Sequence, residues 1–329
     1  LGDDVITVYS DSVVDLIALN SAGGDDAISL SATATKQVDI DSASGNDNIT
    51  ISDLTGAISV DTGQDDDLVS VTNSLSDVSA VLNISTASGE DVVNLAQLAG
   101  DISVQAGEGK DQINLSDSTN SVGTSVKLDG QDNDDSYNLQ GFDGISGIEV
   151  SLSDSGSDAG DVLSIEGTND QDYVHADQGR LSGEGLIEFG QPVLSNTYQY
   201  NDKIYFSKIA KVELDLLAGD DRLLVDDTTV VMTIDLGAGK DEAQVGTVVT
   251  GTDLNGVEVA ISATNGNSHE LTINGGDDND TFYIDHNAAV LNLNGDAGND
   301  SFIINTYLLP GEAVSNNTIS NITGGDGDD

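Results

Sequence analysis

Aspartates recur along this chain at a fixed position behind glycines and ahead of aliphatic residues. Around Asp111, glycines stand four and two residues earlier (Gly107 and Gly109), and aliphatic residues stand two and four residues later (Ile113 and Leu115). The same register returns, with varying completeness, at a set of motif aspartates: Asp4, Asp26, Asp47, Asp67, Asp91, Asp111, Asp135, Asp161, Asp172, Asp221, Asp241, Asp280, Asp300 and Asp329. The chemistry that these residue types supply is the binding of hard cations by oxygen atoms.

If the motif segments stack, their carboxylates come together. Equivalent positions on neighbouring strands lie about 5 Å apart, and further loop aspartates such as Asp65, Asp66 and Asp277 add negative charge. Glycine permits positive φ, so backbone carbonyls can turn toward the same point as the carboxylates. Ca²⁺ takes roughly six to eight oxygen ligands in flexible geometry, whereas Mg²⁺ demands a near-ideal octahedron. We therefore expect multiple Ca²⁺ ions, mainly in one row along one edge, with the motif aspartates as metal ligands and no other cofactor.

The segments between the motif aspartates predict short strands. In Ile49-Thr50-Ile51 and Ile58-Ser59-Val60 apolar and polar residues alternate, and turn-forming residues separate such runs. The best-kept spacings between motif aspartates are 20–26 residues, which is the period of solenoids. The predicted fold class is all-β: a right-handed parallel β-helix or β-roll solenoid with about 20–26 residues per coil, two strands per coil and aliphatic side chains stacked inside.

A longer repeat is superimposed on the short one. The heptapeptide at 147–153 returns 109 residues later at 256–262, and His269 precedes Asp280 by the same 11 residues that separate Asp161 from Asp172. We therefore divide the chain into a uniform short-coil solenoid (1–110) and two copies of a super-repeat (111–220 and 221–329). An irregular insertion near 173–210, which contains Pro192, Tyr198, Tyr200, Tyr205 and Phe206, predicts a longer coil or a hairpin. Packing is the favoured role of these aromatic residues, and carbohydrate stacking is the alternative.

Composition argues against several classes of protein. Asp and Glu number 59 against 9 Lys and Arg, for a net charge of -50, and such a surface repels nucleic acids and anionic membranes. The absence of Cys excludes disulfides, thiolate zinc sites and cysteine nucleophiles. No apolar run is long enough for membrane insertion. With three His, which we expect to face solvent (His175, His269 and His286), and two Arg, no catalytic residues are predicted, and the chain is not expected to be an enzyme.

The loops that end on Asp111, Asp300 and Asp329 resemble the calcium-binding nonapeptide G-G-x-G-x-D-x-U-x of the repeats-in-toxin (RTX, hemolysin-type) family, in the diverged form found in very large secreted bacterial surface proteins. The resemblance implies that these aspartates bind Ca²⁺ between adjacent coils, and that Asp47, Asp91, Asp221, Asp241 and Asp280 do so by their shared register. The family's motifs usually run in tandem along both edges, whereas most coils here carry one motif. The resemblance further implies export by type I secretion and an extracellular or cell-surface location.

The function expected from these features is that of a calcium-stabilised structural rod segment in a large secreted or cell-surface protein, an adhesin or extracellular fibre, that folds on binding Ca²⁺ outside the cell. One alternative is a surface-layer or filament subunit that stacks head to tail. The other is a non-catalytic repeat module of a secreted polysaccharide-active enzyme. The expected partners are Ca²⁺ and neighbouring repeats or copies of the same protein, with cell-surface glycans as further candidates.

Overall fold

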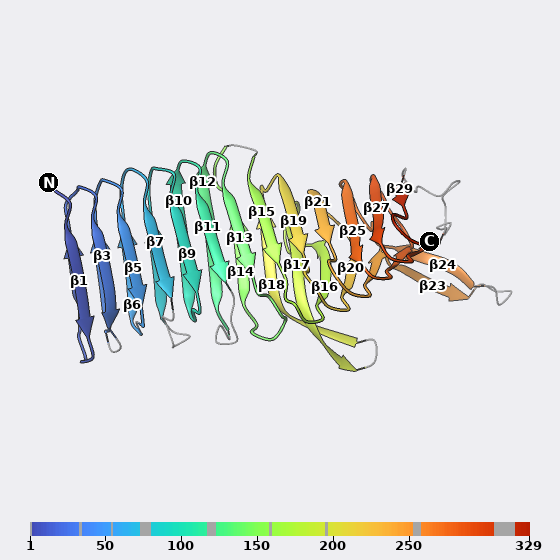
Figure 1. Ribbon diagram of the computed structural model, residues 1–329, viewed down its shortest axis with the longest axis horizontal. Helices are drawn as coiled ribbons and strands as arrows, with labels where there is room; N and C mark the ends of the chain where they lie inside the picture. Colours follow the sequence, from blue (N-terminus) through green and yellow to red (C-terminus); the bar gives the residue numbers. More distant parts are fainter. Residues whose placement is uncertain are drawn as a thin grey trace. The chain divides into compact units, whose positions relative to one another are not determined.

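Strands alone make up the regular structure of the described residues. The computed structural model describes residues 2–32, 35–53, 55–72, 80–116, 123–157, 160–194, 197–252, 258–305 and 320–329. Within these ranges there is no helix that could cross a membrane. The strands pair in parallel, coil upon coil, as a β-solenoid (Figure 1), so the predicted fold class is confirmed. The chain divides into two compact units: unit 1 is residues 1–164 and 201–210, and unit 2 is residues 165–200 and 211–329.

In unit 1 the chain alternates between two parallel sheets, one strand in each per coil. The first sheet contains β1 (Val5–Ser10), β3 (Ala27–Ala32), β5 (Asn48–Ser52), β7 (Leu68–Thr72), β9 (Val92–Ala96), β11 (Gln112–Ser116), β13 (Ser136–Gln140) and β15 (Val162–Glu166), in that order. The second contains β2 (Ile17–Asn20), β4 (Gln37–Asp41), β6 (Ala57–Asp61), β8 (Val81–Ser85), β10 (Asp101–Glu108), β12 (Ser125–Asp132), β14 (Glu149–Ser153) and β18 (Thr197–Ser207). The unit boundary falls inside β15 and β18.

Unit 2 continues the two-sheet pattern with two antiparallel additions. One sheet runs β19 (Lys211–Asp215), β21 (Val231–Asp235), β25 (Leu271–Asp277), β27 (Leu291–Ala297) and β29 (Ser320–Thr323). The other runs β16 (Tyr173–Gln178), β20 (Arg222–Val225), β22 (Glu242–Val245), β26 (Thr281–Ile284) and β28 (Ser301–Ile304). β17 (Gly185–Leu194) pairs antiparallel with β16, and β23 (Val248–Thr252) pairs antiparallel with β24 (Glu258–Ala263). The insertion near 173–210 therefore contains the predicted hairpin.

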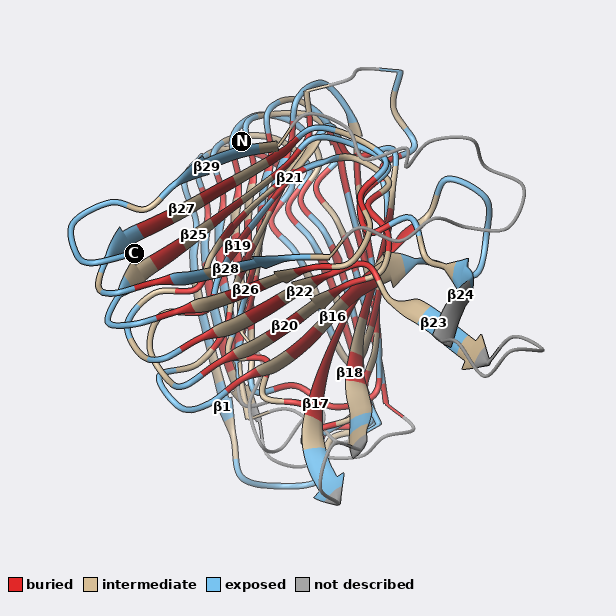
Figure 2. Ribbon diagram, turned by 90° about the vertical axis from the view of Figure 1, so that its right-hand side faces the viewer, coloured by how far each residue is buried: buried red, intermediate tan, exposed pale blue. Residues whose placement is uncertain are grey.

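The core lies between the two sheets of each coil. Ile49 and Ile51 of β5 and Ile58 and Val60 of β6 are at most 2% exposed, and the residues between them point outward. The parallel register places Ile51 between Leu30 and Val71, so that aliphatic side chains stack from coil to coil. Figure 2 shows the same alternation of buried and half-buried residues along β20 and β22 of unit 2. The alternation of the sequence therefore predicts which face of each strand is buried.

Coil length differs between the two units. In unit 1, successive motif aspartates are 20 to 26 residues apart, as predicted. In unit 2, steps of 20 residues are interspersed with longer ones of 29, 39 and 49. The step of 39 residues contains the β23–β24 hairpin, and the step of 49 contains β17. The two longest steps therefore arise where extra strands are inserted.

The super-repeat is not reproduced in strand pairing. β14, in the first heptapeptide, pairs parallel with β12, whereas β24, in the second, pairs antiparallel with β23. Residues 256 and 257 of the second heptapeptide lie outside the described residues. The two compact units do not test the division of the sequence after residues 110 and 220, which stays a prediction.

The stacked aliphatic core predicts a large effect of cavity formation. Replacing Ile51 by Ala should lower the free energy of unfolding by about 2–5 kcal/mol, because the flanking coils are hydrogen-bonded in place and cannot collapse into the space. Thr50→Ala on the outward face of the same strand should change it by no more than about 0.5 kcal/mol. Urea titration followed by circular dichroism measures both variants, and equal small losses would contradict a closely packed core.

Candidate metal centre

From Asp26 to Asp300, each motif aspartate ends a loop that joins a strand of one sheet to a strand of the other. We call the residues of this connection, including the aspartate, the aspartate loop; residues 42–47 between β4 and β5 are an example. The backbone takes positive φ at the fourth and second residues before most of the motif aspartates, as at Gly107 (117°) and Gly109 (143°) before Asp111. The loops that show this conformation end on Asp26, Asp47, Asp67, Asp91, Asp111, Asp135, Asp221, Asp241, Asp280 and Asp300. This conformation explains the predicted glycine pattern. Ala43 (71°), which replaces a glycine of the motif, holds the same conformation.

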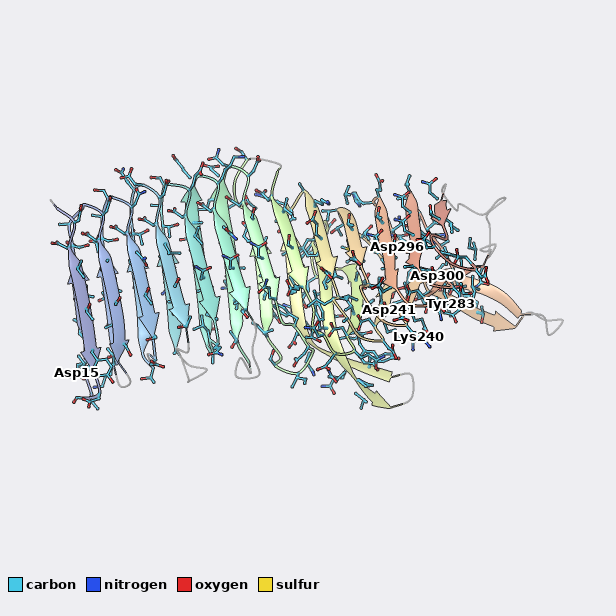
Figure 3. The ribbon with its side chains drawn as sticks, in the orientation of Figure 1. Asp15, Lys240, Asp241, Tyr283, Asp296 and Asp300 are labelled. Carbon is cyan, nitrogen blue, oxygen red and sulfur yellow. The ribbon has the colours of Figure 1, made fainter. Side chains whose placement is uncertain are left out.

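Hydrogen bonds connect the motif aspartates into a row, the aspartate row, in each unit. The backbone N–H of each aspartate donates to Oδ1 of the aspartate in the next coil, over 2.7–3.0 Å. In unit 1 the row is Asp4, Asp26, Asp47, Asp67, Asp91, Asp111, Asp135 and Asp161. In unit 2 it is Asp172, Asp221, Asp241, Asp280, Asp300 and Asp329. Figure 3 labels Asp241 and Asp300. Every predicted site residue therefore lies in a row, although their role as metal ligands stays a prediction.

A second set of hydrogen bonds runs in the opposite direction, one residue before several of the motif aspartates. The N–H of Glu90 donates to Oδ1 of Asp66 in the preceding coil over 2.8 Å, and the N–H of Lys240 donates to Asp220 over 3.0 Å. Asn299 donates to Asn279 in the same way. Because the two sets run in opposite directions, the coils that form both sets donate to and accept from their neighbours at this edge.

The carboxylates of the row are buried, and many have an oxygen with no donor. From Asp26 to Asp161 in unit 1 and from Asp172 to Asp300 in unit 2, the motif aspartates are at most 5% exposed. The Oδ2 atoms that have no hydrogen-bond partner belong to residues including Asp26, Asp111, Asp135, Asp221, Asp241, Asp280 and Asp300. Asp202 shows the contrast, because this buried carboxylate accepts from three backbone N–H groups and the Ser146 hydroxyl. The fold can satisfy a buried carboxylate, and at these seven positions of the row it leaves one oxygen without a donor.

Burial makes the charged form unfavourable for several carboxylates of the row, among them Asp111, Asp135, Asp221 and Asp241. Desolvation, followed by the charges of neighbouring aspartates, raises the pKa of Asp135 to about 8 and the pKa values of Asp221 and Asp241 to about 7. Desolvation also raises the pKa of Asp111, to about 6. A bound cation would compensate both the lost hydration and the repulsion. Without a cation, protonation of the carboxylates removes the charge instead.

Three carboxylates converge at one place in unit 1. Oxygen atoms of Asp135, Asp154 and Asp161 all lie within 4.8 Å of one another, and all three residues are buried. Asp135 and Asp161 belong to the row, whereas Asp154 does not. The Tyr137 hydroxyl donates to Oδ2 of Asp154 over 2.9 Å. This cluster has the ligand chemistry to hold a metal ion.

Sequence reasoning did not identify Asp154 or Tyr137. The signal that could have found them is a departure from the repeat. Asp154 lies seven residues before Asp161, where other motifs have an aliphatic residue such as Val104, and Tyr137 lies two residues after Asp135, where Ile113 follows Asp111.

The histidines are placed differently from one another. His175 does not face solvent, contrary to prediction: its Nδ1 lies 3.3 Å from Glu188 and its Nε2 lies 3.1 Å from Asp226. Burial lowers the pKa of His175, but hydrogen bonds to the two carboxylates outweigh this effect and raise it to about 9. His269 is exposed, and its Nδ1 lies 2.9 Å from the Thr228 carbonyl rather than in the row.

The aromatic residues of the insertion separate into two groups. Tyr205 and Phe206 are buried, as expected for packing. The rings of Tyr198 and Tyr173 lie 4.8 Å apart, and Arg222 donates to the Tyr198 hydroxyl. These three half-buried residues line a hollow of about 210 Å³ in unit 2.

No family model, curated protein or solved structure matches this chain. The fold and the aspartate row therefore carry the functional argument alone.

Proposed function

We propose that this chain is a calcium-stabilised structural segment of a large secreted or cell-surface protein, of the adhesin or extracellular-fibre kind. The observation that supports this proposal is the aspartate row, in which buried carboxylates of successive coils have an oxygen with no donor. Ca²⁺ accepts carboxylate and carbonyl oxygens in flexible geometry. It therefore suits a set of loops that share a backbone but differ in sequence.

The mechanism is folding coupled to ion binding. With a net charge of -50 and no cation, the aspartate loops repel one another when the coils stack. In the proposed mechanism, the chain stays unfolded at the low Ca²⁺ concentration of the cytosol and folds at the higher concentration outside the cell. Because the ligands come together only in the folded solenoid, the free energy of binding contributes directly to the free energy of folding.

Circular dichroism during a Ca²⁺ titration of the purified chain tests the proposal. We expect a cooperative transition from coil to β-structure near millimolar Ca²⁺, with Mg²⁺ a weaker substitute because it tolerates irregular cages poorly. The β signal should be lost on addition of a chelator. An undiminished β signal in the chelator at pH 8 would contradict the folding switch.

A matched pair of variants assigns the effect to the row. Asp111→Asn keeps an oxygen that can accept from Asp91 but removes a buried charge, so it should reduce the stabilisation by Ca²⁺. Asp101→Asn removes the same charge from an exposed position on β10 and should leave the titration unchanged. If the two variants behave alike, the Ca²⁺ response reflects general charge screening instead of bound ions.

A further inference from the structure

One aspartate loop differs in length from the others. Counted between the two strands that they join, the loops that end on Asp47, Asp67 and Asp241 each contain six residues. The loop between β14 and β15, which ends on Asp161, contains eight (154–161). Two further departures from the repeat, Gly130 and Tyr137, lie beside it.

Asp154, the first residue of the longer loop, occupies a position next to the motif carboxylates. Leu128 of β12 pairs in register with Leu152 of β14, so Asp154 is equivalent to Gly130, two residues further along. In the preceding coils this position holds small residues: Ser21, Ser42, Thr62, Thr86 and Ala106. In unit 1 a carboxylate occurs at this position only at Asp154, among the described residues.

Tyr137 and Gly130 also differ from their equivalents in the preceding coils, and they lie next to Asp154 and Asp135. Tyr137 is in register with Ile113, where the other coils have aliphatic residues, and it is fully buried. Its hydroxyl donates to Asp154 and accepts from the Gly130 N–H over 2.6 Å. A Cβ atom on Gly130 would lie 2.0 Å from Oδ2 of Asp135 and 2.7 Å from the Tyr137 hydroxyl. Gly130, Tyr137 and Asp154 therefore depend on one another.

One carboxylate oxygen from each of Asp135, Asp154 and Asp161 lies within 4.8 Å of the other two. Oδ1 of Asp135 accepts from the Asp111 N–H, and Oδ1 of Asp154 accepts from the Gly156 N–H. Oδ2 of Asp135 is buried and has no donor. An upper separation of 4.8 Å between the carboxylate oxygens matches oxygens around one Ca²⁺, each about 2.3–2.6 Å from the ion.

We propose that Asp135, Asp154 and Asp161 bind one hard divalent cation at a discrete site, with Tyr137 orienting Asp154. The choice of Ca²⁺ as the ion rests on the proposed function, whereas the site rests on the geometry of these four residues. Three carboxylates at one ion give more charge than the row supplies elsewhere, and ligand charge is a main determinant of affinity. This site therefore binds more tightly than the others and fills first.

Calcium binding to the full chain, measured by isothermal titration calorimetry, tests the site. Asp154→Asn should remove one ion per chain from the tightest class and leave weaker binding unchanged, while Asp101→Asn should bind as the wild type does. If Asp154→Asn binds as many ions with the same affinities, the cluster shares protons instead and the inference is wrong. If wild type binds only one ion and Asp154→Asn none, the site stands and the proposed calcium row fails.

Terbium luminescence provides a second measurement, which also applies if Asp154→Asn fails to fold. Tb³⁺ replaces Ca²⁺ and is excited through a nearby phenol ring, and the chain has no Trp. Tyr137→Phe should abolish the sensitised emission from the tightest site, and it should weaken Ca²⁺ binding there about 10-fold because Asp154 loses its orienting donor. Emission and affinity that are unchanged in Tyr137→Phe would overturn the assignment.

Discussion

In metal-free buffer, the unfolding temperature of this protein should fall steadily as the pH is raised from about 4, until the chain no longer folds near pH 8. The pKa values of Asp67, Asp221, Asp241 and Asp280 rise from 3.8 to about 7, chiefly through burial. Near pH 4 the folded protein keeps these protons. As the pH rises, the unfolded chain ionises first, so the stability that they contribute is lost through the folded pKa values. Each group accounts for on the order of 4 kcal/mol, which is large against a typical stability of about 5–15 kcal/mol.

Millimolar Ca²⁺ should reverse this dependence. The ionised carboxylate is the ligand, so binding strengthens as the protons leave, and the unfolding temperature should stay level or rise up to pH 8. Thermal melts followed by circular dichroism measure both series. A metal-free series in 1 M NaCl is the control, because surface charges are screened within about 3 Å there while the buried groups still titrate. A metal-free unfolding temperature that increases toward pH 8 would contradict the buried row.

The second large effect is expected where neighbouring aspartate loops contact each other. At Gly109 the backbone has a φ of 143°, and an added Cβ would lie 1.5 Å from the Gly89 carbonyl oxygen of the neighbouring coil. Gly109→Ala should therefore lower the free energy of unfolding by at least about 4 kcal/mol. The corresponding fall in unfolding temperature is on the order of 10 °C.

Gly147→Ala is the matched control in unit 1. Gly147 also has positive φ (71°), but a Cβ there would meet nothing within 4 Å. Its substitution should cost only the conformational penalty, about 1–2 kcal/mol. Thermal and urea unfolding in Ca²⁺ separate the conformational penalty from the cost of the contact between coils. Equal losses in the two variants would show that conformation, not contact between coils, is what requires glycine.

The sequence predicted the row because the information is local. A motif aspartate such as Asp241 follows two positions that need positive φ, and both lie within four residues of it. The stacking of the coils then follows from the spacing between successive motif aspartates, which stays at 20 to 26 residues throughout unit 1. Loops that lack the first of the two glycines, such as that of Ala43, adopt the same backbone, and hydrogen bonds to both neighbouring coils hold them in place.

What the sequence did not reveal depends on contacts between coils of unequal length. Asp154 reaches Asp135 because the pairing of β12 with β14 places it beside Gly130 of the neighbouring coil, and no local pattern states which residue it will meet. His175 meets Asp226 across a step of 51 residues that contains an antiparallel strand. His269 precedes Asp280 by the interval that separates Asp161 from Asp172, which suggested an equivalent coil. The Asp241 N–H, however, donates directly to Asp280, so His269 is not part of the row.

The two edges of the unit 1 coils differ in how much length they tolerate. At the edge that carries the aspartate row, the aspartate loop has six residues in every coil but one. Its length is fixed because hydrogen bonds run between neighbouring loops in both directions. At the other edge, four residues (53–56) join β5 to β6, and eight (73–80) join β7 to β8. Insertions and deletions acquired during evolution can therefore accumulate at that edge without disturbing the stack. The same edge would let the solenoid serve as a display scaffold, carrying a different grafted peptide on each coil.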